Sequence, residues 1–181
     1  MTQITPLIQE VYKDYTPSVN VKKIVKILLQ YVPPEDLAHL QTIVLMNTAA
    51  LSRERKRQRS SSGASILEVM GRYHPGYKEQ PAYIEIYVDN TLDSAVGYDL
   101  QFPYLRNRLF ANVLYHEIGH HCQHMSKSRL IKQEDFANKY SARLRKRFAR
   151  QHYWYLGTFY WVMKKVGLVK FIEGHSGVRI E

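Results

Sequence analysis

The stretch His116-Glu117-Ile118-Gly119-His120 matches the pattern H-E-x-x-H and lies in a segment with helical periodicity. Residues four apart lie one turn apart on the same face of an α-helix, so the two imidazoles can bind one metal ion together. Glu117 follows the first histidine and can reach a water molecule on that ion. The motif therefore predicts zinc-dependent hydrolysis of peptide bonds, with a metal-activated water as nucleophile and Glu117 as general base.

The segment before this motif predicts a long helix. Pro103 suits the first turn of a helix, and no glycine or further proline follows it until Gly119. Apolar residues fall close to one stripe of this helix: Leu105, Leu109, Val113 and Ile118. We therefore expect the helix to begin near Pro103 and to carry the motif.

A catalytic zinc site needs a third protein ligand. Glu134 and Asp135 follow the motif after the polar segment 125–129, which is long enough to turn the chain. A second helix over about 131–150 can then run back past the first and bring one of the two carboxylates to the metal. His124 lies two turns from His116, about 12 Å along the helix axis, which is too far for it to share an ion with both motif histidines.

The residues around Glu134 carry a resemblance to a known family. Glu134-x-x-Ala137-Asn138 resembles the E-x-x-[SA]-[DN] signature that follows H-E-x-x-H in gluzincins, the thermolysin-like zinc peptidases. The resemblance covers about residues 80–145 and looks most like the small single-domain minigluzincins and the ImmA/IrrE-like peptidases. It implies a zincin-like fold in which two ligand-bearing helices follow a small sheet.

The resemblance also implies roles for individual residues. The family spacing favours Glu134 over Asp135 as the third ligand. Ala137 would allow close packing of the two helices, and Asn138 would hydrogen-bond the far nitrogen of a ligand histidine and orient its ring. The implied zinc ligands are His116, His120 and Glu134.

The order of elements along the chain predicts an α+β fold. Helical spacing predicts a helix over 21–31 and a short helical segment over 35–40. Strand signals at 42–46, 65–73 and 82–89 predict a small sheet of about three strands. The resemblance implies that strand 82–89 lies at the sheet edge over the cleft, where an extended peptide substrate would pair with it.

Length and charge set the broad class. The chain has 181 residues, 45% of them hydrophobic, which suits a single domain over 1–181 with a core of its own. Its formal charge of +10 at pH 7 predicts attraction to acidic substrates, nucleic acid or other anionic surfaces. The basic run 53–59, inside a predicted flexible loop over 52–65, is a candidate contact for such partners.

A second basic run over 143–150 leads into an aromatic C-terminal segment, 151–181. Its apolar part is much shorter than the about 20 residues that a membrane-spanning helix needs. This segment can pack as a C-terminal helix, lie on an anionic membrane surface or form an oligomer contact. The N-terminal sequence lacks a signal peptide and Cys122 is the only cysteine, so a cytoplasmic location is expected.

Two alternatives to a constitutive peptidase remain open. The chain can be a basic nucleic-acid- or membrane-surface-binding protein with a structural or regulatory metal site, in which His124 or Asp135 supplies a fourth ligand. It can also be a latent peptidase blocked by its own C-terminal segment, 151–181. The oxyanion-stabilising residue is open too, and its candidates are Tyr140, His152, Tyr153 and Tyr155.

Three residues near the ligands are expected to have structural roles. His121 faces away from the ligand pair, so a surface position is expected. Cys122 is expected to be a buried small hydrophobic residue. Tyr140, six residues after Glu134, points to another face of its helix and is expected in the core.

Overall fold

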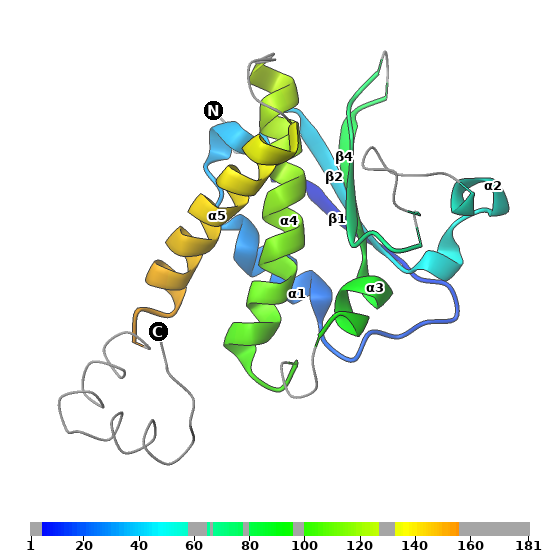
Figure 1. Ribbon diagram of the computed structural model, residues 1–181, viewed down its shortest axis with the longest axis horizontal. Coiled ribbons are helices and arrows are strands. Elements are labelled where there is room, and N and C mark those ends of the chain that lie inside the picture. Colours follow the sequence, from blue (N-terminus) through cyan, green and yellow to red (C-terminus); the bar gives the residue numbers. More distant parts are fainter. Residues whose placement is uncertain are drawn as a thin grey trace. The chain divides into compact units, whose positions relative to one another are not determined.

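Figure 1 shows the computed structural model of the chain. The structure describes residues 5–57, 65, 67–77, 80–95, 100–126 and 133–155. The chain forms two compact units, Met1–Arg145 and Lys146–Glu181, and the second is described for residues 146–155. The predicted single domain over 1–181 stays a prediction.

The first unit is a mixed α+β structure built on a four-stranded sheet with strand order β1-β2-β4-β3. Strands β1 (Leu7–Val11), β2 (Leu40–Met46) and β4 (Ala82–Tyr87) are parallel, and β3 (Gly71–His74) pairs antiparallel with β4. The α+β class is confirmed. The strands predicted over 42–46 and 82–89 are also confirmed, although the second ends at Tyr87.

Two predictions about the sheet are wrong. The described residues form four strands, not about three. The sequence did not indicate β1, because only Ile8 of this strand is buried and the strand shows little hydrophobic alternation. Strand β4 is not at the edge, since β2 and β3 pair with it on its two sides. The edge strand next to it is β3, which corresponds to the end of the strand predicted over 65–73.

The described residues contain five α-helices: α1 (Val21–Leu29), α2 (Arg53–Lys56), α3 (Val88–Asp93), α4 (Pro103–Ser126) and α5 (Gln133–His152). Two short 3-10 helices, Pro34–Leu37 and Thr48–Ala50, flank β2. The helices expected near 21–31, from Pro103 into the motif and near 131–150 are confirmed as α1, α4 and α5. None of the helices in the described part of the chain has the length and apolar character needed to cross a membrane.

Helix α2 corrects the prediction of a flexible loop over 52–65. The side chain of Ser52 accepts a hydrogen bond from the N–H of Arg55 and caps this short helix at its N-terminus. The rest of that segment lies largely outside the described residues, since 58–64 and 66 are not described. The first half of the basic run is therefore helical.

One face of the sheet packs against α4 and α1, as Figure 1 shows. Alternate strand residues supply the core on this face, and α4 contributes large apolar side chains to it. The hydroxyl of Tyr115 on α4 donates a hydrogen bond to the carbonyl of Leu28 on α1 at 2.9 Å. Fully buried core residues are Ile43, Leu45, Ile84, Ile86, Phe110 and Leu114. The motif helix is thus held rigidly over the sheet.

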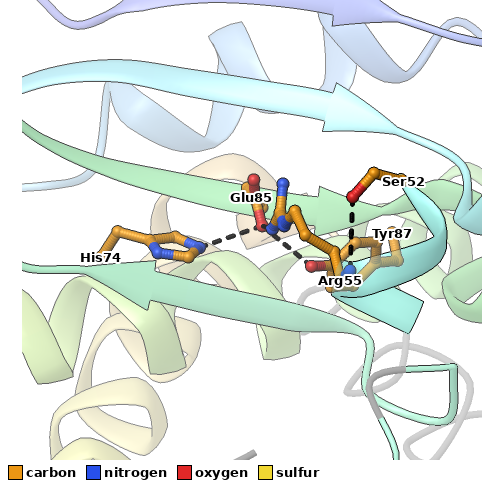
Figure 2. Close-up of polar contacts among 5 residues, drawn as sticks. All are labelled: Ser52, Arg55, His74, Glu85 and Tyr87. Carbon is orange, nitrogen blue, oxygen red and sulfur yellow. Dashed lines mark hydrogen bonds and ion pairs between the residues drawn. The ribbon is translucent and has the colours of Figure 1, made fainter. Parts of the chain in front are cut away.

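The opposite face carries a charged cluster centred on Glu85 of β4 (Figure 2). The Oε2 atom of Glu85 accepts hydrogen bonds from Arg55 Nη2 at 2.6 Å and from the Tyr87 hydroxyl at 2.8 Å. The same oxygen lies 3.0 Å from Nε2 of His74 on β3. Because the Glu85 side chain is only 4% exposed, these partners are needed to keep its charge in the protein interior. The cluster ties α2 and β3 to β4.

The cluster also sets the ionisation of Glu85. Burial by itself would raise the pKa of Glu85, but the hydrogen bonds from His74 and Arg55 outweigh burial and lower this pKa to about 2. The folded-state pKa thus lies below the ordinary value of 4.5. The ionised carboxylate stabilises the fold above that ordinary value, and this contribution is lost as the pH falls toward 2.

Lowering the pH from about 5 to about 2 should reduce the free energy of unfolding of both the wild type and Glu85→Gln. We expect the reduction to be roughly 3 kcal/mol larger in the wild type, because only the wild type loses the charge of this carboxylate. Urea unfolding at a series of pH values measures the difference. Glu10→Gln is the control, since Glu10 forms an exposed ion pair with Lys22. Parallel pH profiles for wild type and Glu85→Gln would contradict the interpretation.

Candidate metal centre

Three side chains from α4 and α5 meet in the first unit. His116 and His120 lie one turn apart on α4, and Glu134 lies in the first turn of α5. The Nε2 atoms of the two histidines are 3.0 Å apart. Glu134 places Oε2 at 3.3 Å from His116 Nε2 and Oε1 at 3.7 Å from His120 Nε2. These are the three side chains that sequence analysis predicts as ligands.

The spacing of these atoms is close to that of metal ligands. Ligand atoms that lie about 2.0–2.2 Å from a tetrahedral zinc ion are about 3.3–3.5 Å from one another. The two histidine Nε2 atoms are 3.0 Å apart, and they lie 3.3 and 3.7 Å from two different oxygens of Glu134. With one ligand atom from each residue, the three atoms lie within 4.8 Å of one another. The group could therefore hold a divalent metal ion, and two imidazoles with one carboxylate are a donor set of open zinc sites.

Among the described residues, no second group of three or more His, Cys, Asp or Glu side chains lies close enough together to hold a metal ion. Asp135 and His124 are both exposed and do not belong to the group. The alternative ligand Asp135 and a closed site with four protein ligands are therefore less compatible with the geometry than the set His116, His120 and Glu134.

The protonation of His120 also suits metal binding. Burial lowers the pKa of His120, and the neighbouring His116 lowers it further, while Glu134 acts in the opposite direction. The ring of His120 is thus neutral near neutral pH. Neutral imidazole is the form that has a lone pair available for a metal ion.

Glu117 lies beside this group and is buried, with 7% of its surface exposed. The Glu134 side chain, in contrast, is 52% exposed. Burial raises the pKa of Glu117 to about 8, and the charge of Glu134 raises it as well. The backbone N–H of Tyr73, which donates a hydrogen bond to the carboxylate, and the charge of Arg72 act in the opposite direction, but burial outweighs them. A cation held by the neighbouring ligands would lower the pKa of Glu117 from this raised value and favour the ionised form, which can accept a proton.

Gly71 on the edge strand β3 makes room for Glu117. A Cβ atom at this position would lie 2.7 Å from Val113 Cγ1 and 3.0 Å from both Cγ and Oε1 of Glu117. Strand β3 therefore approaches α4 closely at the point where the motif begins. Sequence analysis missed Gly71, because an isolated glycine at the start of a short strand does not show which side chain faces it.

Tyr73 joins β3 to α4 through its side chain as well. Its hydroxyl lies 3.2 Å from Nδ1 of His121 and 3.4 Å from Nδ1 of His124, and His121 Nε2 lies 2.8 Å from the carbonyl oxygen of Ala38. Because a carbonyl can only accept, Nε2 of a neutral His121 carries the hydrogen and Nδ1 accepts from the Tyr73 hydroxyl. Tyr73 thus contacts Glu117 with its backbone and His121 with its side chain.

The prediction that His121 lies at the surface is wrong. His121 is only 1% exposed, because the helix face opposite the ligands is covered by Tyr73 and by the segment around Ala38. Helical periodicity shows which residues share a face, but it does not show that a second face is also covered. Burial and these hydrogen bonds make His121 a structural residue.

Helices α4 and α5 are in close contact at Gly119 and Ala137. A Cβ atom at position 119 would lie 2.7 Å from the Cα and 3.1 Å from the carbonyl oxygen of Ala137. Glycine in a helix interior costs about 1 kcal/mol relative to alanine, and here the close approach of the backbones explains it. The packing role expected for Ala137 is consistent with this contact, which brings Glu134 within reach of the two histidines.

The remaining predicted residues are distributed as follows. Tyr140 is buried and its hydroxyl donates to Asp36 Oδ2 at 2.6 Å, so its predicted core position is confirmed. Cys122 is half-buried, with Sγ 3.8 Å from the carbonyl oxygen of Asp36.

Asn138 is exposed and, among the described residues, is hydrogen-bonded to neither ligand histidine, so its orienting role stays a prediction. The other oxyanion candidates belong to the second unit, and their role stays a prediction: His152, Tyr153 and Tyr155.

Comparison with protein-family models, with curated proteins and with solved structures gives no match for this chain. The resemblance to gluzincins therefore rests on the motif 116–120, the signature 134–138 and the geometry that brings them together.

We expect Gly119→Ala to weaken zinc binding at least tenfold, because a methyl group at the helix crossing forces α5 and Glu134 away from the histidines. Overpacking of this kind costs about 1–3 kcal/mol, which exceeds the gain of about 1 kcal/mol in helix propensity. Competition titration with a chromogenic chelator measures the affinity for zinc, and urea unfolding measures the stability. Adding Ala137→Gly should not restore binding, since the nearest obstructing atom is backbone. Unchanged zinc affinity in Gly119→Ala would refute the packing argument.

We expect Tyr73→Phe to increase the hydrogen-exchange rate of the backbone amide at residue 73 about 5–10-fold, because loss of one hydrogen bond to His121 costs about 1–1.5 kcal/mol and loosens β3. Nuclear magnetic resonance of the exchanging amides measures the change. Tyr83→Phe is the matched control, since Tyr83 lies on the other face of the sheet, where its ring stacks on His74. Equal effects of the two substitutions would show that Tyr73 does not hold β3 through its hydroxyl.

Proposed function

We propose that the chain is a zinc-dependent metallopeptidase, whose first unit has a zincin-like arrangement. The observation that carries the proposal is the convergence of two imidazole nitrogens and a carboxylate oxygen, all within 4.8 Å of one another, beside the buried Glu117. An ion bound by three protein ligands keeps an open position, where it polarises a carbonyl oxygen and lowers the pKa of water.

Glu117 has the properties that a general base at this position needs. In the proposed reaction its carboxylate accepts a proton from the attacking water and later delivers it to the leaving amine. The N–H of Tyr73 and the space at Gly71 fix the position of the carboxylate. The burial that raises the pKa of Glu117 also stabilises the protonated carboxyl group between these two steps.

The edge strand β3 is the best-placed element for an extended substrate. Among the described strands β3 pairs with β4 alone, so no other described strand occupies the other side of its backbone. It also contacts Glu117 directly, through Tyr73 and Gly71. We propose that a peptide binds to β3 by β-augmentation, in the role that sequence analysis gave to strand 82–89.

The alternative of a structural or regulatory metal site is less well supported. It requires a fourth protein ligand, and neither His124 nor Asp135 joins the group in the described residues. The latent-peptidase alternative depends on the segment 151–181, of which 156–181 lie outside the described residues, so it stays a prediction. An open site with three ligands favours catalysis over a purely structural role.

We expect Glu117→Gln to lower kcat for peptide hydrolysis by about 10²–10⁴-fold while zinc remains bound, because the amide cannot accept the proton. Glu134→Ala should lose zinc together with activity, since only two ligands remain. Metal analysis of the purified variants and a peptide-cleavage assay with the zinc-loaded protein measure both effects.

Asp135→Asn is the matched control, because it removes the neighbouring exposed carboxylate and should change neither zinc content nor activity. A Glu117→Gln variant with full activity would exclude Glu117 as the base. Loss of zinc from Asp135→Asn but not from Glu134→Ala would assign the third ligand to Asp135.

A further inference from the structure

The second unit concentrates positive charge in the sequence. Residues 146–181 contain seven Lys or Arg and two Glu, a net charge of +5, which is half of the charge of +10 on the whole chain. No Asp or Glu occurs between Asp135 and Glu173. This unit therefore contains few carboxylates of its own to balance its cations, and such a charge attracts anionic partners.

The described part of this unit shows how the cations are presented. Lys146, Arg147 and Arg150 lie on the last turns of α5, and all three are exposed. Trp154 and Tyr155 follow the end of the helix and are 67% and 49% exposed. Three cations and two large exposed aromatic side chains thus lie within ten residues of one another.

The two exposed rings are supported by buried ones. The ring centroids of Tyr155 and the buried Tyr153 are 6.0 Å apart, and those of Trp154 and Tyr155 are 6.4 Å apart. Tyr153 in turn packs edge-to-face on the buried Phe148, with centroids 5.5 Å apart. These contacts connect Trp154 and Tyr155 to the buried rings of the unit, yet both remain exposed, although aromatic side chains of this size usually prefer burial.

We propose that the second unit binds the anionic surface of a lipid bilayer, with its cations at the headgroups and Trp154 and Tyr155 at the level where water meets lipid. Lys and Arg near an anionic leaflet contribute attraction, and Trp and Tyr are enriched at the interface. The proposal is independent of the metal centre and of the proposed peptidase activity.

The sequence that follows favours lipid over nucleic acid as the partner. Nucleic acid would also attract the cations and stack on the rings. The sequence after Tyr155 nevertheless contains aliphatic as well as aromatic residues. Aliphatic side chains gain free energy from insertion among acyl chains, but they gain little from stacking on bases. Those residues, which lie outside the described part of the structure, include Leu156, Phe159, Val162 and Met163.

The first test removes the cations from the full-length chain. Co-sedimentation is measured with vesicles of phosphatidylglycerol and phosphatidylcholine, and with vesicles of phosphatidylcholine alone. The triple variant Lys146→Gln, Arg147→Gln and Arg150→Gln should bind the anionic vesicles about 100-fold more weakly, at about 1 kcal/mol for each cation. The matched control removes three cations from the first unit: Arg53→Gln, Lys56→Gln and Arg57→Gln. The control should bind within a few fold of the wild type.

The second test monitors the aromatic residues. The chain has two tryptophans, so a Trp161→Phe background leaves Trp154 as the only one, and its fluorescence should shift to shorter wavelength on anionic vesicles. Trp154→Ser with Tyr155→Ser should weaken binding about tenfold at high salt, where attraction between charges is screened. Tyr77→Ser, at a residue 70% exposed in the first unit, is the control and should have no effect.

Three results would overturn the proposal. Equal losses in the two charge-removal variants would show that net charge alone drives binding. An unshifted Trp154 spectrum on anionic vesicles would show that the rings do not reach the interface. Binding of the full chain to a single-stranded oligonucleotide without binding to anionic vesicles would assign nucleic acid as the partner.

Discussion

The candidate metal centre depends on how closely two helices approach each other. At Gly119 and Ala137 the backbones of α4 and α5 leave no space for an additional methyl group. The side chain of glutamate has a limited reach, so Glu134 can approach the Nε2 atoms of both histidines only if α5 lies this close to α4. The ligand geometry is thus decided by backbone packing at Gly119, next to His120, and at Ala137, one turn after Glu134. Tyr140, anchored on Asp36, adds a second point at which α5 is fixed.

Two buried glutamates, one on each face of the sheet, show how partners determine chemistry. Glu85 has an arginine, a histidine and a tyrosine around one oxygen, and the pKa of its carboxyl group is lowered to about 2. Glu117 has one backbone N–H and a carboxylate neighbour, and its pKa is raised to about 8. Glu85 is therefore charged at neutral pH and stabilises the fold. For Glu117, burial outweighs the single backbone hydrogen bond, so the neutral carboxyl form is favoured up to a higher pH than for an exposed glutamate.

Sequence analysis predicted the parts of the structure that depend on local pattern. Helical patterns gave α1, α4 and α5, and the resemblance of the two motifs to gluzincins implied the group His116, His120 and Glu134, which the fold brings together. It failed where the outcome depends on long-range pairing. Whether a strand is central or at an edge depends on its neighbours, so β4 was misplaced and the largely exposed β1 was missed. Gly71, Tyr73 and the buried state of His121 follow from the docking of β3 on α4, which leaves no periodic signal in the sequence.

The short strand β3 has a mechanical consequence, because its alternate residues serve opposite faces of the sheet. Gly71 and Tyr73 contact Glu117, whereas His74 contacts the Glu85 cluster that also holds α2. A shift of this strand on one face would also move its residues on the other face. The basic helix α2 and the carboxylate of Glu117 are therefore linked through four residues of backbone, although the sheet lies between them.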